Sequence, residues 1–184
     1  DAGTAKKLIE KNLPYDEVKR LAVKLVQHAS PQTALLEAEP QVLALIRDIV
    51  KPELEQAGLR PVIDGMGNLI LHIKGRTRND RLMLVGYAMN AAPSTMPNPY
   101  SGEIVDGATY KLNGECVWGR GACEQKGSLA AMIAAIRFLG ASKIELPSDL
   151  YLVVSTAGET GRHDSLAYVL DHGRVETDWC IIDG

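Results

Sequence analysis

Hydrophobic residues recur at helical spacing in two stretches near the start of the chain. Apolar side chains three and four positions apart predict an amphipathic helix over residues 15–29. The same spacing returns after a Glu-Ala-Glu-Pro segment and predicts a second helix over residues 40–57. Pro52 lies inside this second pattern and should kink or interrupt the helix, because proline lacks the N–H that a helix interior needs. Gly58 should end it.

Short apolar runs between helical segments predict the strands of a sheet. These runs lie at residues 61–64, 69–73, 82–85, 150–154 and 178–183. The run at residues 82–85 is wholly apolar, which is typical of a strand that is buried on both faces, and residues 150–154 and 178–183 read as further buried strands. Two further helices are predicted over residues 125–139, which are rich in alanine, and over residues 163–172. The alternation of strands and helices predicts an α/β fold with a central sheet, mostly parallel or mixed, flanked by helices.

Two polar segments are predicted to be loops. Residues 76–81 are all polar and should form a loop that connects two strands. Residues 87–107 contain three closely spaced prolines and read as a long irregular loop. Loops of this length within a compact domain are usually functional.

Composition and charge exclude several classes of partner. The 184 residues carry a formal net charge of −3, and the basic residues form no block that would favour nucleic acid or an anionic membrane. No apolar run approaches the ~20 residues of a membrane-spanning helix, so we expect no membrane association. The three cysteines lack CxxC spacing, which favours a reducing, cytoplasmic location.

Residues capable of chemistry follow the predicted strands. Residues 87–90, residues 155–159 and Asp183 each come at the end of an apolar run, and a glycine-containing loop, residues 119–127, precedes the alanine-rich helix. Because the carboxyl ends of parallel strands meet at one edge of a sheet, we expect these residues to lie close together. Cys123 in that loop is a candidate nucleophile near a helix N-terminus, or simply a small packed residue.

Several motifs occur in an order that resembles a known family. They are GNLI at 67–70, PYSGEI at 99–104 with DG at 106–107, WGRGA at 118–122 with KG at 126–127, and AGETG at 157–161. Together they resemble the amino-terminal half of the zinc aminopeptidase-type hydrolases, which include aminoacylase, acetylornithine deacetylase, succinyl-diaminopimelate desuccinylase and glutamate carboxypeptidase. The resemblance implies that residues 1–184 form the amino-terminal part of one α/β catalytic domain. It also implies that the rest of that domain and any dimerisation domain are absent from this chain.

The resemblance implies a metal site whose residues are altered here. By the family pattern, Glu124 is the bridging carboxylate, and Glu159 and Asp183 are further ligands. The family's first ligand is a histidine, which is replaced by Tyr87, and its general base is a glutamate, which is replaced by Gly158. Glycine cannot take a proton from water. Asn90 could fill part of the space that the family's GHxD motif occupies.

This donor set predicts altered metal chemistry. Carboxylates without histidine suit Mg²⁺, Mn²⁺ or Ca²⁺ better than Zn²⁺, so we do not expect two tightly bound zinc ions, although one divalent metal on Glu124, Glu159 and Asp183 is possible. We predict catalytic roles for Glu124, Glu159, Tyr87 and Asn90, and substrate binding by Cys123, Lys126 and His163.

The predicted function is hydrolysis of an amide or peptide-like C–N bond in a small acylated amine or amino acid. Three alternatives stay open: a weakly metal-dependent deacylase or peptidase, a catalytically inactive binding or regulatory subunit, and a hydrolase whose nucleophile is the amino terminus of a second chain cleaved after Gly184. The expected partners are a small-molecule amide and a second chain or missing carboxyl-terminal half. We also expect an oligomer.

Overall fold

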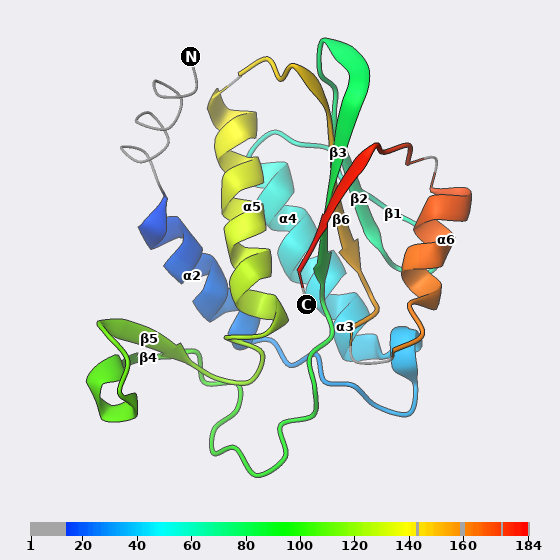
Figure 1. Ribbon diagram of the computed structural model, residues 1–184. Helices are drawn as coiled ribbons and strands as arrows, with labels where there is room; N and C mark the ends of the chain where they lie inside the picture. Colours follow the sequence, from blue (N-terminus) through cyan, green and yellow to red (C-terminus); the bar gives the residue numbers. More distant parts are fainter. Residues whose placement is uncertain (1–13, 143, 159–160, 174, 184) are drawn as a thin grey trace.

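The computed structural model describes residues 14–142, 144–158, 161–173 and 175–183. Within them, five strands form a central sheet in the order β1-β2-β6-β3-β7 (Figure 1). The strands are β1 (Val62–Ile63), β2 (Leu69–Ile73), β3 (Thr77–Tyr87), β6 (Ser148–Ser155) and β7 (Trp179–Ile182). β3 runs parallel to both β6 and β7, whereas β2 runs antiparallel to β1 and β6. The predicted α/β fold is confirmed, with a mixed sheet.

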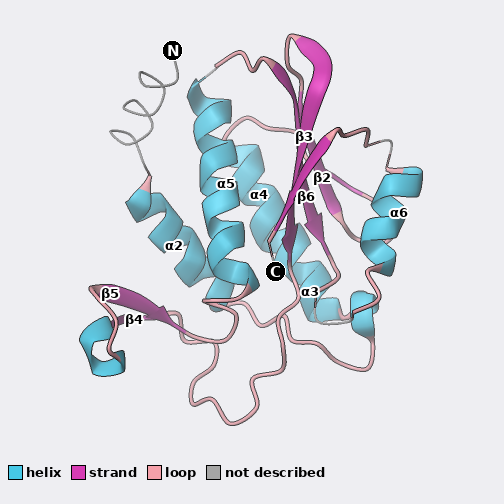
Figure 2. Cartoon of the chain, viewed as in Figure 1, coloured by secondary structure: helices cyan, strands magenta, loops and turns pink. Residues whose placement is uncertain are grey.

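Helices cover both faces of this sheet (Figure 2). They are α2 (Tyr15–Val26), α3 (Pro40–Ala44), α4 (Lys51–Gln56), α5 (Gln125–Ser142) and α6 (Asp164–His172). α2 to α5 lie on one side and α6 lies on the other (Figure 1). The first predicted helix is therefore three residues shorter than expected, and the alanine-rich helix is longer. In the part of the chain that the structure describes, no helix is both long enough and apolar enough to cross a membrane.

The hydrophobic core is divided by the sheet into two clusters. In β6, Leu152 contributes to the cluster under α2 to α5, and the next residue, Val153, contributes to the cluster under α6. Successive side chains of a strand point to opposite faces, which explains the division. Val169 joins α6 to the second cluster. The uninterrupted apolar run of β6 is thus explained by burial on both faces.

The predicted helix over residues 40–57 is built from three helical segments. Between α3 and α4, the π-helix η2 (Leu45–Val50) carries the chain up to Pro52, and the Lys51 N–H donates to the Ile46 carbonyl five residues earlier. The predicted interruption by Pro52 thus takes the form of a π turn before the proline. Gly58, at φ +78°, ends the helix through the 5→2 and 6→1 hydrogen bonds of a Schellman motif.

An ion-pair network around Glu53 joins the helices on one side of the sheet. The Glu53 side chain is 2% exposed and accepts hydrogen bonds from Arg20 (2.7 Å) and Lys24 (2.6 Å) of α2. Arg137 of α5 lies 3.1 Å from the same carboxylate. These cations hold the pKa of Glu53 at about 2, with the Arg20 hydrogen bond as the largest cause. A buried carboxylate is stabilised by this pairing across α2, α4 and α5.

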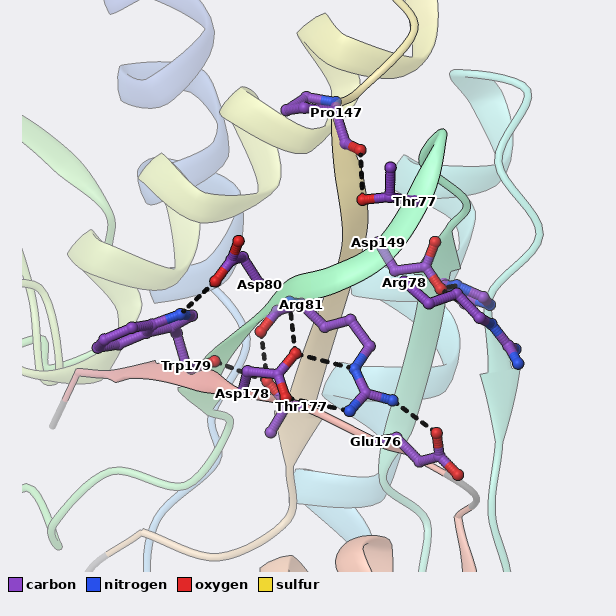
Figure 3. Close-up of polar contacts among 11 residues, drawn as sticks. Thr77, Arg78, Asp80, Arg81, Pro147, Asp149, Glu176, Thr177, Asp178 and Trp179 are labelled. Carbon is purple, nitrogen blue, oxygen red and sulfur yellow. Dashed lines mark hydrogen bonds and ion pairs between the residues drawn. The ribbon is translucent and has the colours of Figure 1, made fainter.

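The prediction of a loop at residues 76–81 is wrong from residue 77 onward, because β3 begins at Thr77. The first half of β3 is exposed, so its polar sequence does not show the apolar pattern of a buried strand. Arg81 holds this half in place: its Nε and Nη2 each donate to the Asp178 carboxylate at 3.1 Å, and its Nη1 lies 2.6 Å from Glu176 (Figure 3). The Asp178 N–H donates back to the Arg81 carbonyl (3.0 Å), which aligns β7 on β3.

The predicted irregular loop at residues 87–107 also contains a strand. β4 (Glu103–Asp106) pairs antiparallel with β5 (Glu115–Trp118), which the sequence analysis did not predict. This hairpin, with the 3₁₀ helix η3 (Gly107–Tyr110) between its strands, lies apart from the central sheet (Figure 1). Residues 88–102 remain irregular except for a single bridge between Pro31 and Asn90.

β7 differs from its prediction as a buried strand. Its four residues are all exposed, and Trp179, Ile181 and Ile182 are each more than half exposed. β7 is the edge strand of the described sheet, bonded to β3 on one side. The apolar sequence was read correctly as a strand, but burial requires neighbours that the described residues do not supply.

Candidate active site at the carboxyl ends of the strands

The predicted functional residues are brought to the edge of the sheet where β3, β6 and β7 end. Tyr87 closes β3 opposite Ser155 at the end of β6. Asp183 follows β7, and its N–H donates to the Val85 carbonyl at 3.2 Å. Glu159 and Gly184 lie outside the described residues. The prediction that the strand ends converge is therefore confirmed for Tyr87 and Asp183.

The loop before α5 is packed so tightly that it requires glycine. Gly121 has φ +85°, and a Cβ placed there would lie 3.1 Å from the Lys126 side chain and 3.2 Å from Asn90 Cβ. Arg120, the residue before Gly121, makes two hydrogen bonds to the preceding segment. Its backbone N–H donates to the Pro99 carbonyl at 2.6 Å, and its Nε donates to the Ala91 carbonyl at 3.0 Å. This loop is thereby anchored to the irregular segment that follows β3.

Glu124 is held by one carboxylate oxygen and is unsatisfied at the other. Arg120 Nη2 lies 3.2 Å from Oε1, which forms an ion pair. Oε2 is buried and has no hydrogen-bond partner among the described residues. Burying a polar oxygen without a partner costs about 1–3 kcal/mol. Such an atom has its hydrogen-bonding capacity free for a proton, a water molecule or a ligand.

Lys126 is a fully buried amine beneath the same loop. Its Nζ donates to the His28 carbonyl at 2.7 Å and lies 5.4 Å from the centre of the Tyr100 ring. No carboxylate pairs with it within the described ranges. Burial therefore lowers the pKa of Lys126 to about 7. The ammonium form of Lys126 has three N–H donors and one acceptor is seen here, the His28 carbonyl, so Lys126 has spare donor capacity.

Asn90 is fully buried, and its hydrogen bonds are made to neighbouring segments. Its Oδ1 accepts from the Ser30 hydroxyl at 3.0 Å, and its Nδ2 donates to the Ala91 carbonyl at 2.7 Å. Its backbone also pairs with Ser30 and Gln32. Asn90 thus fixes the path of the chain beside Gly121. Its predicted catalytic role stays a prediction.

Tyr87 and His163, both predicted from the sequence, are neighbours in the structure. Their ring centres are 5.9 Å apart, with the planes tilted by 41°. His163 has φ +56° and directly precedes α6. Burial raises the pKa of Tyr87, so the phenol remains protonated well above neutral pH. Cys123, by contrast, is exposed.

A buried polar network that begins at Asn68 was not predicted from the sequence. Asn68 Nδ2 donates to Asp64 (2.9 Å) and to the Ser165 carbonyl (3.0 Å), and its Oδ1 accepts from the Thr156 N–H (3.0 Å). The Ser155 and Ser165 hydroxyls, 2.8 Å apart, extend this network. The amide of Asn68 therefore joins the end of β6 to the start of α6. The sequence shows Asn68 as part of a turn motif, and such a motif does not indicate a contact with Thr156, which is 88 residues away in the sequence.

The described residues at this edge differ from the donor set that the family pattern gives for a dinuclear zinc centre. Tyr87 occupies the position of the first histidine in the family pattern. Met89, whose thioether side chain is fully buried, occupies the position of the aspartate in that pattern. At Gly158, a Cβ would lie 2.7 Å from the Met89 carbonyl oxygen and 3.0 Å from its Cβ, which leaves no room for a carboxylate side chain. Among the residues that the structure covers, no three His, Cys, Asp or Glu side chains gather as a metal site would require.

Comparisons with solved structures show the fold of known peptidases. Human carnosine dipeptidase 1 is 18% identical with a TM-score of 0.71, and the match covers 94% of this chain and 39% of that one. A metallo-carboxypeptidase from Sulfolobus solfataricus is 18% identical with a TM-score of 0.68, covering 91% and 37%. A dinuclear metal-binding peptidase from Bacillus subtilis is 14% identical with a TM-score of 0.55, covering 85% and 38%.

This chain spans about two fifths of the length of these structures. The model of one protein family, described as peptidase family M20/M25/M40, matches residues 89–183. The matched segment includes the loop of Glu124, the end of β6 and the whole of β7. The chain therefore belongs to peptidase family M20/M25/M40.

Proposed function

We propose that the protein is a peptidase-like hydrolase that cleaves the amide C–N bond of a small acylated amine or amino acid. The observation that carries this proposal is the buried, unpartnered Oε2 of Glu124 at the sheet edge of a member of this peptidase family. This chain corresponds to 39% of the length of its dipeptidase neighbour. We propose that a carboxyl-terminal half or a second chain supplies further residues of the site, and that the protein is an oligomer.

Glu124 is proposed to move the proton in this reaction. The ion pair of Oε1 with Arg120 fixes the carboxylate, so that Oε2 is free to accept a proton from water or to donate one to the leaving amine. The spare donors of Lys126, which lies in the same loop two residues after Glu124, are proposed to favour the negative charge that develops on the carbonyl oxygen during amide hydrolysis. Glu159 and Tyr87 remain proposed participants.

A weakly metal-dependent version of the same hydrolysis is the second candidate. It is favoured by the same oxygen, because an unpartnered carboxylate oxygen is also what a Mg²⁺, Mn²⁺ or Ca²⁺ ion binds. In this version Glu124, Glu159 and Asp183 would hold one ion, which would polarise the amide carbonyl. We also propose a reducing, cytoplasmic location, which the three unpaired cysteines support.

The test is Glu124→Gln in the complete protein, assayed on a panel of N-acetyl amino acids and dipeptides. Loss of acid–base catalysis should lower kcat by at least ~100-fold with little change in KM. Glu145→Gln, at an exposed and weakly paired glutamate, is the matched control. Undiminished turnover in Glu124→Gln contradicts the assignment, and a wild-type protein that turns over nothing supports an inactive binding subunit.

Metal content separates the two candidates. The proposed metal-independent reaction should survive dialysis against a chelator, and elemental analysis should find fewer than two zinc ions per chain. Activity that is lost on dialysis and restored by Mn²⁺ or Mg²⁺ alone supports the second candidate. Two tightly held zinc ions contradict both.

A further inference from the structure

A cavity of about 510 Å³ opens beside the carboxyl end of β6. It lies between the β1–β2 turn and the segment formed by η1 (Leu36–Ala38) and α3. This volume is within the range of small-molecule binding pockets. The surface of the cavity is mainly apolar, with Leu43, Ile63 and Met66 as its large apolar side chains.

One wall of the cavity is a rigid turn. The Asp64 carboxylate accepts hydrogen bonds from the backbone N–H groups of Met66 and Asn68, each at 2.9 Å. Gly67, at φ +87°, packs so closely on α3 that a Cβ would lie 2.3 Å from the Leu43 side chain. A wall that is already ordered loses little conformational entropy when a ligand binds.

The charged residues around the cavity are already engaged with protein groups. Asp64 is bonded within the turn and to Asn68, Arg47 Nε lies 2.6 Å from Asp48, and Glu37 also has an interaction partner. None of these groups therefore has to be paired by a ligand. An uncharged apolar group suits such a pocket, because it gains from burial and disrupts no existing pair.

The cavity is joined to the candidate active site through the end of β6. A Cβ on Gly67 would lie 3.3 Å from Thr156 Cγ2, and Thr156 is bonded to Asn68 of the same turn. At Gly158, two residues further, a Cβ would lie 2.7 Å from the carbonyl oxygen of Met89, which is the second residue after β3. We propose that this cavity is the subsite for the apolar side chain of the substrate amide, so that the enzyme prefers leucine-like and phenylalanine-like groups. This inference rests on the proposed function.

The test fills the cavity and measures side-chain preference in the complete protein. Wild type and Met66→Trp are assayed on N-acetylglycine, N-acetylalanine, N-acetylleucine and N-acetylphenylalanine, and on the corresponding Xaa-Gly dipeptides. Wild type should prefer leucine over alanine by at least ~10-fold in kcat/KM, as expected for added methylenes in an apolar pocket. Met66→Trp should reduce this preference below ~3-fold, through a higher KM for the larger side chains only.

Controls separate this inference from the proposed function. Leu35→Trp places the same bulk on a residue of the same segment that is 57% exposed and not part of the cavity wall, and should keep the wild-type preference. If wild type hydrolyses none of the panel, the proposed function fails. The subsite is then judged by calorimetric binding of N-acetylleucinamide against N-acetylglycinamide.

Two outcomes overturn the subsite. One is a leucine preference that is absent in wild type or unchanged in Met66→Trp, in the kinetic or the binding series. The other is a parallel loss for all side chains together with a lower Tm, which would mean that a segment of the protein itself occupies the cavity.

Discussion

The two ends of the central sheet differ in how fully their charged side chains are paired. At the amino ends of β3, β6 and β7, charged groups pair with one another: Arg81 with Asp178 and Glu176, and the buried Asp149 with His72 at 3.1 Å and the Gly75 N–H at 2.9 Å. Figure 3 shows how the contacts of Arg81 with Asp178 and Glu176 join β7 to β3. At the carboxyl ends, Glu124 keeps an unpartnered oxygen and Lys126 keeps spare donors.

This difference separates stabilising charge from charge that is available for chemistry. Paired groups lower the free energy of the fold, and they hold the pKa of Asp178 and Asp149 below their ordinary values. Unpaired buried groups cost free energy, which a protein tolerates where they act on a ligand. The contrast supports the proposed placement of the active site at the carboxyl ends of the strands.

Asn68→Ala should have the largest effect on stability, because it breaks the buried network that holds the carboxyl end together. It leaves the Thr156 N–H and the Ser165 carbonyl without the Asn68 amide and removes one of the hydrogen bonds of Asp64, and it should lower the free energy of unfolding by about 3 kcal/mol. Urea denaturation measures this change. Asn113→Ala, in a turn of the β4–β5 hairpin, is the control. A loss no greater than that of the control would mean that water replaces the amide.

Lys126→Met should change how stability depends on pH. The native pKa of about 7 lies below the ordinary value of 10.5, so between these values the unfolded chain binds one more proton than the folded chain. Stability of wild type should therefore rise with pH in this window, by about 2 kcal/mol from pH 7 to 9 relative to Lys126→Met. Denaturation of both proteins at the two pH values measures it. Lys74→Met controls for loss of an exposed lysine, and parallel curves for wild type and Lys126→Met would contradict the burial argument.

Arg81→Met should have the smallest effect, since its partners at the amino ends are largely solvated. Tm should fall by less than in Asn68→Ala, and kcat should remain within ~2-fold of wild type because no group near Glu124 changes. Thermal denaturation and steady-state kinetics measure the two quantities. A kcat that falls as strongly as in Glu124→Gln would show that β7 alignment controls the active site, and would remove the distinction between the two ends.

The fold was predictable where burial leaves a pattern of apolar residues in the sequence. α2 was found because Leu21, Leu25 and Val26 line a single buried face, and β6 because both of its faces are buried. Thr77–Arg81 was missed because that half of β3 is exposed and its polar sequence carries no pattern of burial. The β4–β5 hairpin was missed for the same reason, since none of its strand residues is buried.

The candidate site was predictable only in its outline. From the order of the motifs, Tyr87, Glu124 and Asp183 were expected at the carboxyl ends of the strands, and Tyr87 and Asp183 lie there. The loop that carries Glu124 packs beside the segment after β3, as the close approach of Gly121 to Asn90 shows. The role of Asn68 and the single acceptor of Lys126 depend on contacts between segments far apart in sequence. Such contacts leave no local pattern, so a single sequence does not reveal them.

The π turn of η2 makes the charge network tolerant of one change in chain length. An i→i+5 turn contains one residue more than the α-helical path, and it comes just before the helix that carries Glu53. Deleting one residue from Leu45–Val50 would let the segment become regular α-helix without turning Glu53 away from Arg20 and Lys24, because the wider turn already takes up the extra residue. A deletion in a regular α-helix, by contrast, rotates everything after it by about 100°. In this helix a single-residue deletion should therefore be tolerated better at the π turn than within a regular turn.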